Sequence, residues 1–178
     1  MYGSIAAFLL IAEPTSPALE IGLALIAAGQ AVRLAAAGHL VKNDVLTRSG
    51  PYAHLRDPLY LGTLFILVGF ALAGTSGAFP AILVGTVLLP ASLAAYFGVY
   101  MPRKRRTETE RLERRFGSEA TEYIAAVPSL VPRLRPARLG PPGEFAIARV
   151  FENSEHLTLL AVAAGVAAVL AKRAGLFP

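Results

Sequence analysis

The longest stretch without charge governs what this chain can fold into. From Pro58 to Pro102 no residue carries a formal charge. The stretch contains two apolar segments, Leu59–Ala73 and Phe79–Tyr100, and the uncharged turn Gly74–Gly77 separates them. A helix of about 20 apolar residues crosses a bilayer core about 30 Å thick. The stretch therefore predicts a helical hairpin in a membrane.

Three further apolar segments flank this hairpin, Tyr2–Ala12, Pro17–Ala37 and Leu157–Ala171, and the first and last are short for a full crossing. Apolar residues make up 54% of the chain and charged residues only 16%, whereas soluble domains average about a quarter charged residues. We therefore expect an all-α integral membrane protein. Residues 1–178 would form one membrane domain with about five transmembrane helices and a cytoplasmic cofactor-binding region.

The positive charge is concentrated between the apolar segments. The formal net charge is +5, and most Lys and Arg residues fall in His39–Pro58 and Met101–Glu155. The hairpin returns the chain to its starting side, so both stretches face one side, which the positive-inside bias makes cytoplasmic. We expect the lipid bilayer as a partner, a bacterial inner membrane as the location, and no nucleic acid. Arg33 is expected to extend its charge to the interface. Lys172 and Arg173 would lie outside if all five segments span, which argues against the fifth as a simple span.

The polar residues 101–155 are expected to form a helix followed by an extended connection. Thr107–Phe116 is rich in helix formers, and Gly117 is a stop signal. Beyond it, continuous helix is excluded by the prolines at positions 128, 132, 136, 141 and 142. Cys is absent, which excludes disulfides, thiolate zinc sites and cysteine nucleophiles. No metal site is predicted.

Two polar blocks are the candidates for chemistry. The first, Asp44–Gly62, has the sequence DVLTRSGPYAHLRDPLYLG. The second begins at Glu108 and has the sequence ETERLERRFGSEATEYIAAVPSLVP. Taken separately, the first is typical of a loop with interfacial Tyr52 and Tyr60. The second, with the arginines before it, is typical of a basic helix attracted to anionic lipid headgroups.

Taken together, the two blocks resemble a family. GPYAHLRDPLYLG resembles the Gly-(Pro/Val)-Tyr-x-x-x-Arg-His-Pro-x-Tyr-x-Gly signature of the isoprenylcysteine carboxyl methyltransferases and their phospholipid methyltransferase relatives. The second block resembles their Glu-Glu-x-x-Leu-x-x-x-Phe-Gly signature, which is followed by Tyr and Val-Pro-x-x-x-Pro. The resemblance covers residues 33–132 as a methyltransferase-like core. Residues 133–178 remain as a C-terminal extension with an additional apolar helix. Asp57, Thr109 and Ala120 depart from the His, Glu and Tyr of the signatures.

The resemblance implies a methyltransferase that uses S-adenosylmethionine and releases S-adenosylhomocysteine. Glu108 would bind the ammonium or ribose of the cofactor, and Arg56 its carboxylate. The family position that orients a carboxylate substrate falls at Lys104, flanked by Arg103 and Arg105, so Lys104 and Arg105 are the implied catalytic residues. The implied cofactor-binding residues are Asp44, Val45, Leu46, Thr47, Tyr52, Arg56, Asp57, Pro58, Leu59, Tyr60 and Glu108.

The acceptor and two rival functions stay open at this point. The resemblance implies a lipophilic acceptor, either an isoprenoid or prenylcysteine carboxylate or a phospholipid-like molecule. An amine or thiol acceptor would have to lose a proton, and His39 and His54 are candidate bases, although a lone loop histidine is more often a polar loop residue. One rival is an NADPH-dependent membrane reductase of the sterol reductase type. The other is a non-catalytic membrane scaffold, which the departures at Asp57 and Thr109 suggest.

Overall fold

The computed structural model describes Pro14 and residues 16–42, 45–74, 98, 101–141 and 143–176. These residues form helices and connecting segments, and no strand occurs among them, so the predicted all-α class is confirmed. The predicted segments Tyr2–Ala12 and Phe79–Tyr100 lie outside the described residues, Gly98 excepted. The number of transmembrane helices therefore stays a prediction.

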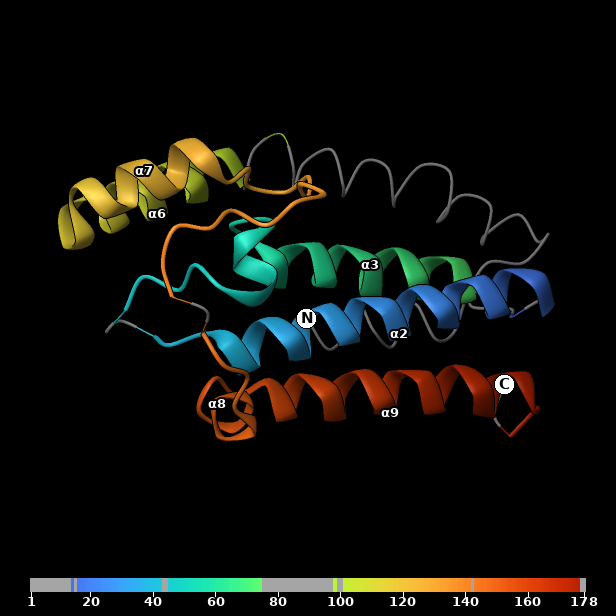
Figure 1. Cartoon of the computed structure of the whole chain (residues 1–178). Helices are drawn as coiled ribbons and strands as arrows, with labels where there is room; N and C mark the ends of the chain where they lie inside the picture. The colour runs from blue at the N-terminus through green and yellow to red at the C-terminus, as the bar shows by residue number, and fades with distance from the viewer. Residues whose placement is uncertain are drawn as a thin grey trace.

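Three helices pack side by side, each in contact with the other two, and together are called the helical layer (Figure 1). They are α2, Ser16–His39, α3, Pro58–Ala73, and α9, Glu155–Arg173. Both α2 and α9 are long and apolar enough to cross a membrane, whereas α3, with 16 residues, is shorter. A helix of 16 residues rises roughly 24 Å, so α3 alone falls short of a full bilayer core.

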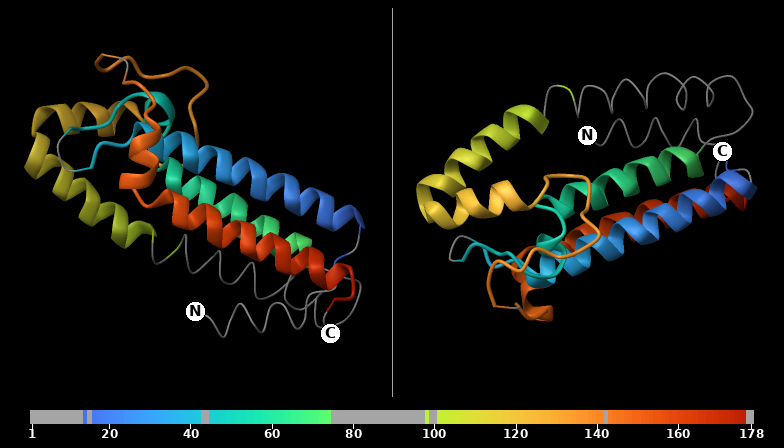
Figure 2. Two further views of the ribbon diagram at one scale, coloured as in Figure 1. Left: turned by 90° about the horizontal axis from the view of Figure 1, so that it is seen from below. Right: turned by 45° about the horizontal axis from the view of Figure 1, so that its top comes forward.

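The helices alternate in direction along this layer. At one end, Leu19 near the start of α2 packs in a buried cluster with Ala73 at the end of α3 and Val169 near the end of α9. Both α3 and α9 therefore run antiparallel to α2 (Figure 2). Helix α9 is longer than the predicted segment Leu157–Ala171 and lies along most of α2, and whether it is a simple span stays a prediction.

Glycine pairs bring α2 and α3 into backbone contact. A Cβ added to Gly29 would lie 2.6 Å from the carbonyl oxygen of Gly62, and one added to Gly62 would lie 2.6 Å from that of Gly29. One heptad away, Gly22 and Gly69 make the same reciprocal contact at 2.5 and 2.6 Å. Small residues allow such close approach between helices, where dispersion contacts and not hydrophobic burial hold a membrane helix pair together. The register of α2 against α3 is therefore fixed by these four positions.

A second unit covers the end of the layer at which α2 stops and α3 begins. The 3₁₀ turn η1, Gly50–Ala53, precedes α3, and Pro58 occupies the first turn of α3, where its missing N–H costs nothing. Helices α6, Met101–Phe116, and α7, Ser118–Ala126, form a hairpin beside this turn (Figure 1). An extended segment then leads to α8, Ile147–Glu152, and on to α9.

Two details of the polar region differ from the sequence prediction. Gly117 ends α6 as predicted, with φ +54°, which is a left-handed conformation that glycine adopts readily. The chain then re-enters a helix at once, so α7 stands where an irregular connection was predicted. The prediction that the prolines exclude continuous helix is confirmed for residues 128–141 and 143–146, which form bends and irregular segments without a helix.

Arg33 has an ion-pair partner that the sequence did not predict. Its guanidinium turns toward α9, where Nη2 lies 2.7 Å from Glu155 Oε2, and its reach to a membrane interface stays a prediction. The side chain of Arg33 is 16% exposed and that of Glu155 is 4% exposed. A carboxylate within reach makes the lateral pairing possible, and no neighbouring acid was visible in the linear sequence because the two residues lie far apart along it.

Substitution of Gly29 tests the α2–α3 contact. Gly29→Val places side-chain atoms against the backbone of α3, and the resulting overpacking is expected to cost about 2 kcal/mol of unfolding free energy. Ala28→Val is the matched control, because Ala28 is exposed on the adjacent position of α2. Thermal unfolding of both variants in detergent should show a clear loss for Gly29→Val only. Equal melting temperatures would contradict the close contact.

Candidate functional site

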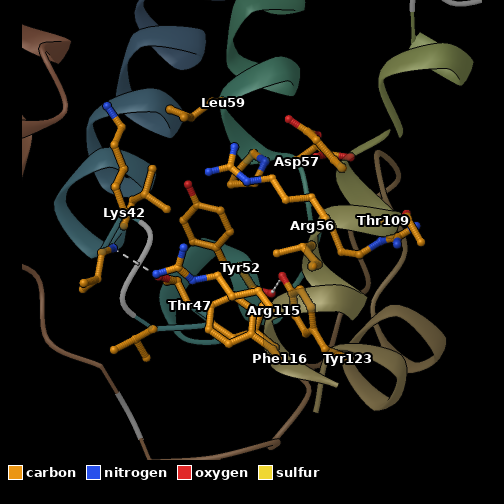
Figure 3. A pocket seen from close by; sticks show the side chains of 18 of the residues that line it. Lys42, Thr47, Tyr52, Arg56, Asp57, Leu59, Thr109, Arg115, Phe116 and Tyr123 are labelled. Atoms are coloured by element: carbon orange, nitrogen blue, oxygen red, sulfur yellow. Dashed lines mark hydrogen bonds between the residues drawn. The ribbon is translucent and has the colours of Figure 1, made fainter. Parts of the chain in front are cut away.

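A cavity of about 510 Å³ opens where α2 ends, α3 begins and the α6–α7 hairpin folds over them. Figure 3 shows its wall, with Tyr52 from η1, Arg56 and Asp57 from the segment before α3, and Arg115 from α6 around one hollow. Pockets for small ligands in proteins typically measure roughly 300–1,000 Å³. The cavity therefore has the size of a small-molecule site.

The cavity gathers the predicted cofactor-binding residues from both sequence blocks. All those with described side chains line it, namely Val45, Leu46, Thr47, Tyr52, Arg56, Asp57, Pro58, Leu59, Tyr60 and Glu108. Asp44 lies outside the described residues. Lys104 and Arg105 belong to α6, but their side chains also lie outside the described part of the chain, so their predicted role stays a prediction.

The two blocks are joined by main-chain hydrogen bonds. The N–H of Arg56 donates to the carbonyl oxygen of Pro128 at 2.8 Å, and the N–H of Asp57 donates to that of Ser129 at 3.1 Å. The Ser129 hydroxyl also donates a short hydrogen bond to the carboxylate of Asp57. Pro128 and Ser129 of the second block thus hold the first block directly before α3. The Asp57 that departs from the family signature has a hydrogen-bond partner of its own.

Two buried tyrosines connect η1 to α7. The hydroxyl of Tyr123 donates to the carbonyl oxygen of Tyr52 at 2.9 Å. Burial, and then the neighbouring Tyr123 and Asp57, raise the pKa of Tyr52 above its ordinary value. Burial and Asp57 likewise raise the pKa of Tyr123. Both phenols therefore stay protonated at neutral pH, and Tyr123 serves as a hydrogen-bond donor.

An apolar cluster supports the floor of the α6–α7 hairpin. Leu46 packs with Ala120, Tyr123 and Val127, and these four are buried. Thr47 supports the same loop, because its Oγ1 accepts a hydrogen bond from the N–H of Val41 at 3.1 Å. The loop 45–49 is therefore fixed between α2 and α7, with its inner side facing the cavity.

Charges of both signs face the cavity. The acids are Asp57 and Glu108, and Tyr60 donates to Oε1 of Glu108 at the long distance of 3.5 Å. Basic side chains outnumber them, namely Arg33, Lys42, Arg56, Arg111 and Arg115. Among the described residues, the Nε of Arg56 is a buried donor that has no hydrogen-bond partner. A buried donor left without an acceptor is costly, so Arg56 is suited to an anionic group of a ligand.

Several residues that line the cavity were not predicted from the sequence. Arg111 and Arg115 follow Glu108 at three and seven positions and share its face of α6, so helical spacing alone could have indicated them. Tyr123 matches the Tyr that follows the second family signature, so the resemblance could have indicated it. Leu40 and Lys42 were not predicted as site residues, because their position depends on where α2 ends.

The two candidate histidines have structural hydrogen bonds. His39 Nδ1 lies 2.8 Å from the carbonyl oxygen of Ala35, and His54 Nδ1 lies 2.8 Å from that of Arg133. A carbonyl only accepts, so each Nδ1 carries the proton and donates it. Neither histidine lines the cavity. Within the described ranges no three His, Asp or Glu side chains gather as a metal ion would require.

The Tyr123 hydrogen bond generates a stability prediction. Tyr123→Phe leaves the carbonyl of Tyr52 buried without its donor, which is expected to cost about 1–3 kcal/mol. Thr121→Val is the control, because it removes an exposed hydroxyl from the same helix. Chemical denaturation of both variants measures the difference. A loss below about 0.5 kcal/mol for Tyr123→Phe, the range of neutral surface changes, would contradict this role.

Comparison of the chain with protein-family models, with curated proteins and with solved structures found no match. The function therefore has to be argued from the residues of the cavity.

Proposed function

We propose that the chain is an integral membrane methyltransferase that transfers the methyl group of S-adenosylmethionine to a lipophilic acceptor. The observation that carries this proposal is the single cavity in which both family-like blocks meet. Glu108 of the second block and Arg56, Asp57 and Tyr60 of the first line one hollow, although the apolar stretch Leu61–Pro102 separates them in sequence.

The polar end of the cavity suits the amino-acid part of the cofactor. S-adenosylmethionine carries an ammonium, a carboxylate and a sulfonium. Glu108 is an acceptor for the ammonium or for ribose hydroxyls, and the unpartnered Nε of Arg56 is a donor for the carboxylate. Hydrogen bonds between charged partners are roughly twice as strong as neutral ones. The two groups therefore supply opposite ends of one zwitterion-binding site.

The rest of the wall suits the adenine and the sulfonium. Tyr52, Tyr60 and Phe116 place aromatic rings on the cavity, beside aliphatic Leu59 and Leu112. Aromatic faces attract cations, and a sulfonium is one. Apolar walls also exclude water from the reacting centre. Methyl transfer needs this combination of orientation and dehydration from the protein, since the cofactor itself supplies the reactive group.

The reaction is a single in-line displacement. A nucleophilic oxygen, nitrogen or sulfur of the acceptor attacks the methyl carbon, the bond from that carbon to sulfur breaks, and the electron pair returns to sulfur. The sulfonium becomes the neutral thioether of S-adenosylhomocysteine. A carboxylate acceptor needs no base, and Lys104 and Arg105 are the proposed groups that orient it.

The proposal of a membrane protein rests on the exposed apolar surface of α9 more than on the composition of the chain. A long apolar helix in a soluble protein is normally buried, but α9 leaves much of its surface uncovered, with Leu157 57%, Leu160 64% and Leu170 43% exposed. Exposed apolar patches larger than a few hundred Å² are rare on soluble monomers. Lipid is the medium in which such a face is stable, which supports insertion of α9 beside α2.

The distribution of charge supports a cytoplasmic cavity. The end of the helical layer that carries the cavity also carries the basic helix α6 and the extended segment with Arg133, Arg135 and Arg138. Loops rich in Lys and Arg remain on the cytoplasmic side, where S-adenosylmethionine is available. An acceptor dissolved in the bilayer would approach from the side of the layer.

Calorimetric titration with S-adenosylhomocysteine tests the proposal. We expect saturable binding to the detergent-purified wild type. Glu108→Gln, which keeps the shape and removes the charge, should raise the Kd roughly ten- to hundredfold, because a hydrogen bond to a charged group contributes about 1.5–3 kcal/mol. Glu110→Gln is the matched control on the same helix, since Glu110 pairs with Arg106 on a face outside the cavity.

Three results would contradict the proposal. They are a folded wild type that does not bind S-adenosylhomocysteine, equal effects of the Glu108 and Glu110 variants, or saturable NADPH binding that Glu108→Gln leaves unchanged. The last would favour the reductase, and no binding of either ligand would favour a scaffold.

Arg56 generates a separate prediction about which part of the ligand it holds. Arg56→Gln should raise the Kd of S-adenosylhomocysteine about tenfold, because the carboxylate loses its partner. The same variant should bind methylthioadenosine, which lacks the amino acid, as well as the wild type does. If both ligands weaken equally, Arg56 does not hold the carboxylate.

A further inference from the structure

Five polar side chains from three helices meet inside the helical layer. Arg33 of α2 donates through Nε to Glu155 Oε1 and through Nη2 to Glu155 Oε2, both at 2.7 Å. Gln30 also donates to Glu155 Oε1, at 3.3 Å. Thr63 of α3 and Thr158 of α9 complete the group as acceptors for Arg33. Glu155 lies in the C-terminal extension, outside the part of the chain that resembles a family.

Arg33 lines the cavity but is not available to bind an anion there. A guanidinium has five N–H donors, and those of Arg33 make five hydrogen bonds, four to side chains of this group and one to the main chain. One of those acceptors is the carbonyl oxygen of Leu59, at 3.2 Å, in the first turn of α3. Arg33 therefore holds residues of the cavity wall in place and does not bind a ligand inside the cavity.

The path of the Arg33 side chain explains how it reaches α3. A Cβ added to Gly62 would lie 2.5 Å from Arg33 Cγ, so the stem of Arg33 passes directly over the glycine. Its Nη1 then donates to Thr63 Oγ1 at 2.6 Å, and Thr63 Oγ1 in turn donates to the carbonyl of Leu59 at 2.8 Å. The first turn of α3, which supplies Pro58, Leu59 and Tyr60 to the cavity, is thus tied to Arg33.

The C-terminal extension also holds the opposite wall. Asn153 Nδ2 donates to the carbonyl oxygens of Ala37 at 2.9 Å and Leu40 at 3.0 Å. Ala37 lies in the last turn of α2, where carbonyls lack partners inside the helix, and its oxygen also accepts from the N–H of Leu40, the residue after the helix, at 3.3 Å. The N–H of Ala146 donates to the carbonyl of Gly38 at 2.9 Å. Leu40 and the two residues after it line the cavity, so both of its inner walls are fixed from residues 146–155.

We propose that Glu155 is a positioning residue of the cofactor site, which through Arg33 sets the first turn of α3 and makes the C-terminal extension a required part of that site. This inference rests on the proposed function. A carboxylate is needed at this position because a guanidinium buried among apolar helices is stable only when it is paired and fully hydrogen-bonded. Without Glu155, Arg33 would turn toward water or toward the cavity, and the tie to Leu59 would be lost.

Paired measurements of S-adenosylhomocysteine Kd and melting temperature on the full chain test this role. Glu155→Gln should lower the melting temperature and raise the Kd about tenfold, whereas the exposed control Glu152→Gln should change neither. The decisive variant is the double substitution Arg33→Met with Glu155→Leu. Apolar replacement of a buried ion pair often preserves stability, so the melting temperature should recover. The Kd should stay high, because no side chain then reaches Leu59 and Thr63.

A Kd that recovers together with the melting temperature would overturn the positioning role, because it would show that Glu155 only stabilises the fold. If the double variant does not fold, Thr63→Val decides the question. It keeps the ion pair and lies outside the cavity lining, but removes one acceptor of Arg33. It should therefore lower the melting temperature less than Glu155→Gln does and raise the Kd several-fold; an unchanged Kd overturns the proposal. Failure of the wild type to bind S-adenosylhomocysteine would instead contradict the proposed function itself.

Discussion

The backbone contact between α2 and α3 is the constraint on which the other features depend. At Gly29 and Gly62 neither helix has a side chain, so each backbone lies against the other within the reach of a single Cβ. This closeness brings Arg33 over Gly62, which allows it to reach Thr63 and the carbonyl of Leu59. The same closeness places the end of α2 beside the start of α3, and the cavity lies at that junction. A wider separation would break the link between the buried ion pair and the cavity wall.

The cavity is built from short segments, none of which would be stable alone. η1, the loop 45–49 and the α6–α7 hairpin are short, and hydrogen bonds between segments distant in sequence hold them together, such as those from Arg56 and Asp57 to Pro128 and Ser129. Buried hydrogen bonds of this kind add only about 1 kcal/mol each when formed, but leaving one partner unpaired costs more. The site is therefore expected to respond to single substitutions far from the ligand, which is the behaviour proposed for Glu155.

The sequence predicted those helix ends that depend on a single residue. Pro58 marks the start of α3 and Gly117 the end of α6, because each residue restricts or frees the backbone at its own position. The grouping of Tyr52, Arg56, Tyr60 and Glu108 on one cavity followed from the resemblance to a family and not from periodicity. Helix α7 was missed because Gly117 was taken to end helical structure, whereas the chain only changes direction there. The Arg33–Glu155 pair was beyond prediction, since nothing in the sequence of α2 indicates which distant segment packs beside it.

Photoaffinity labelling with 8-azido-S-adenosylmethionine, followed by peptide mapping, is the most direct test of the central claim that this cavity is the cofactor site. We expect saturable labelling confined to peptides that contain residues 40–60 and 108–123, with protection by S-adenosylhomocysteine. Labelling that is unsaturable, or that maps to α9 or to the exposed face of α6, would contradict it.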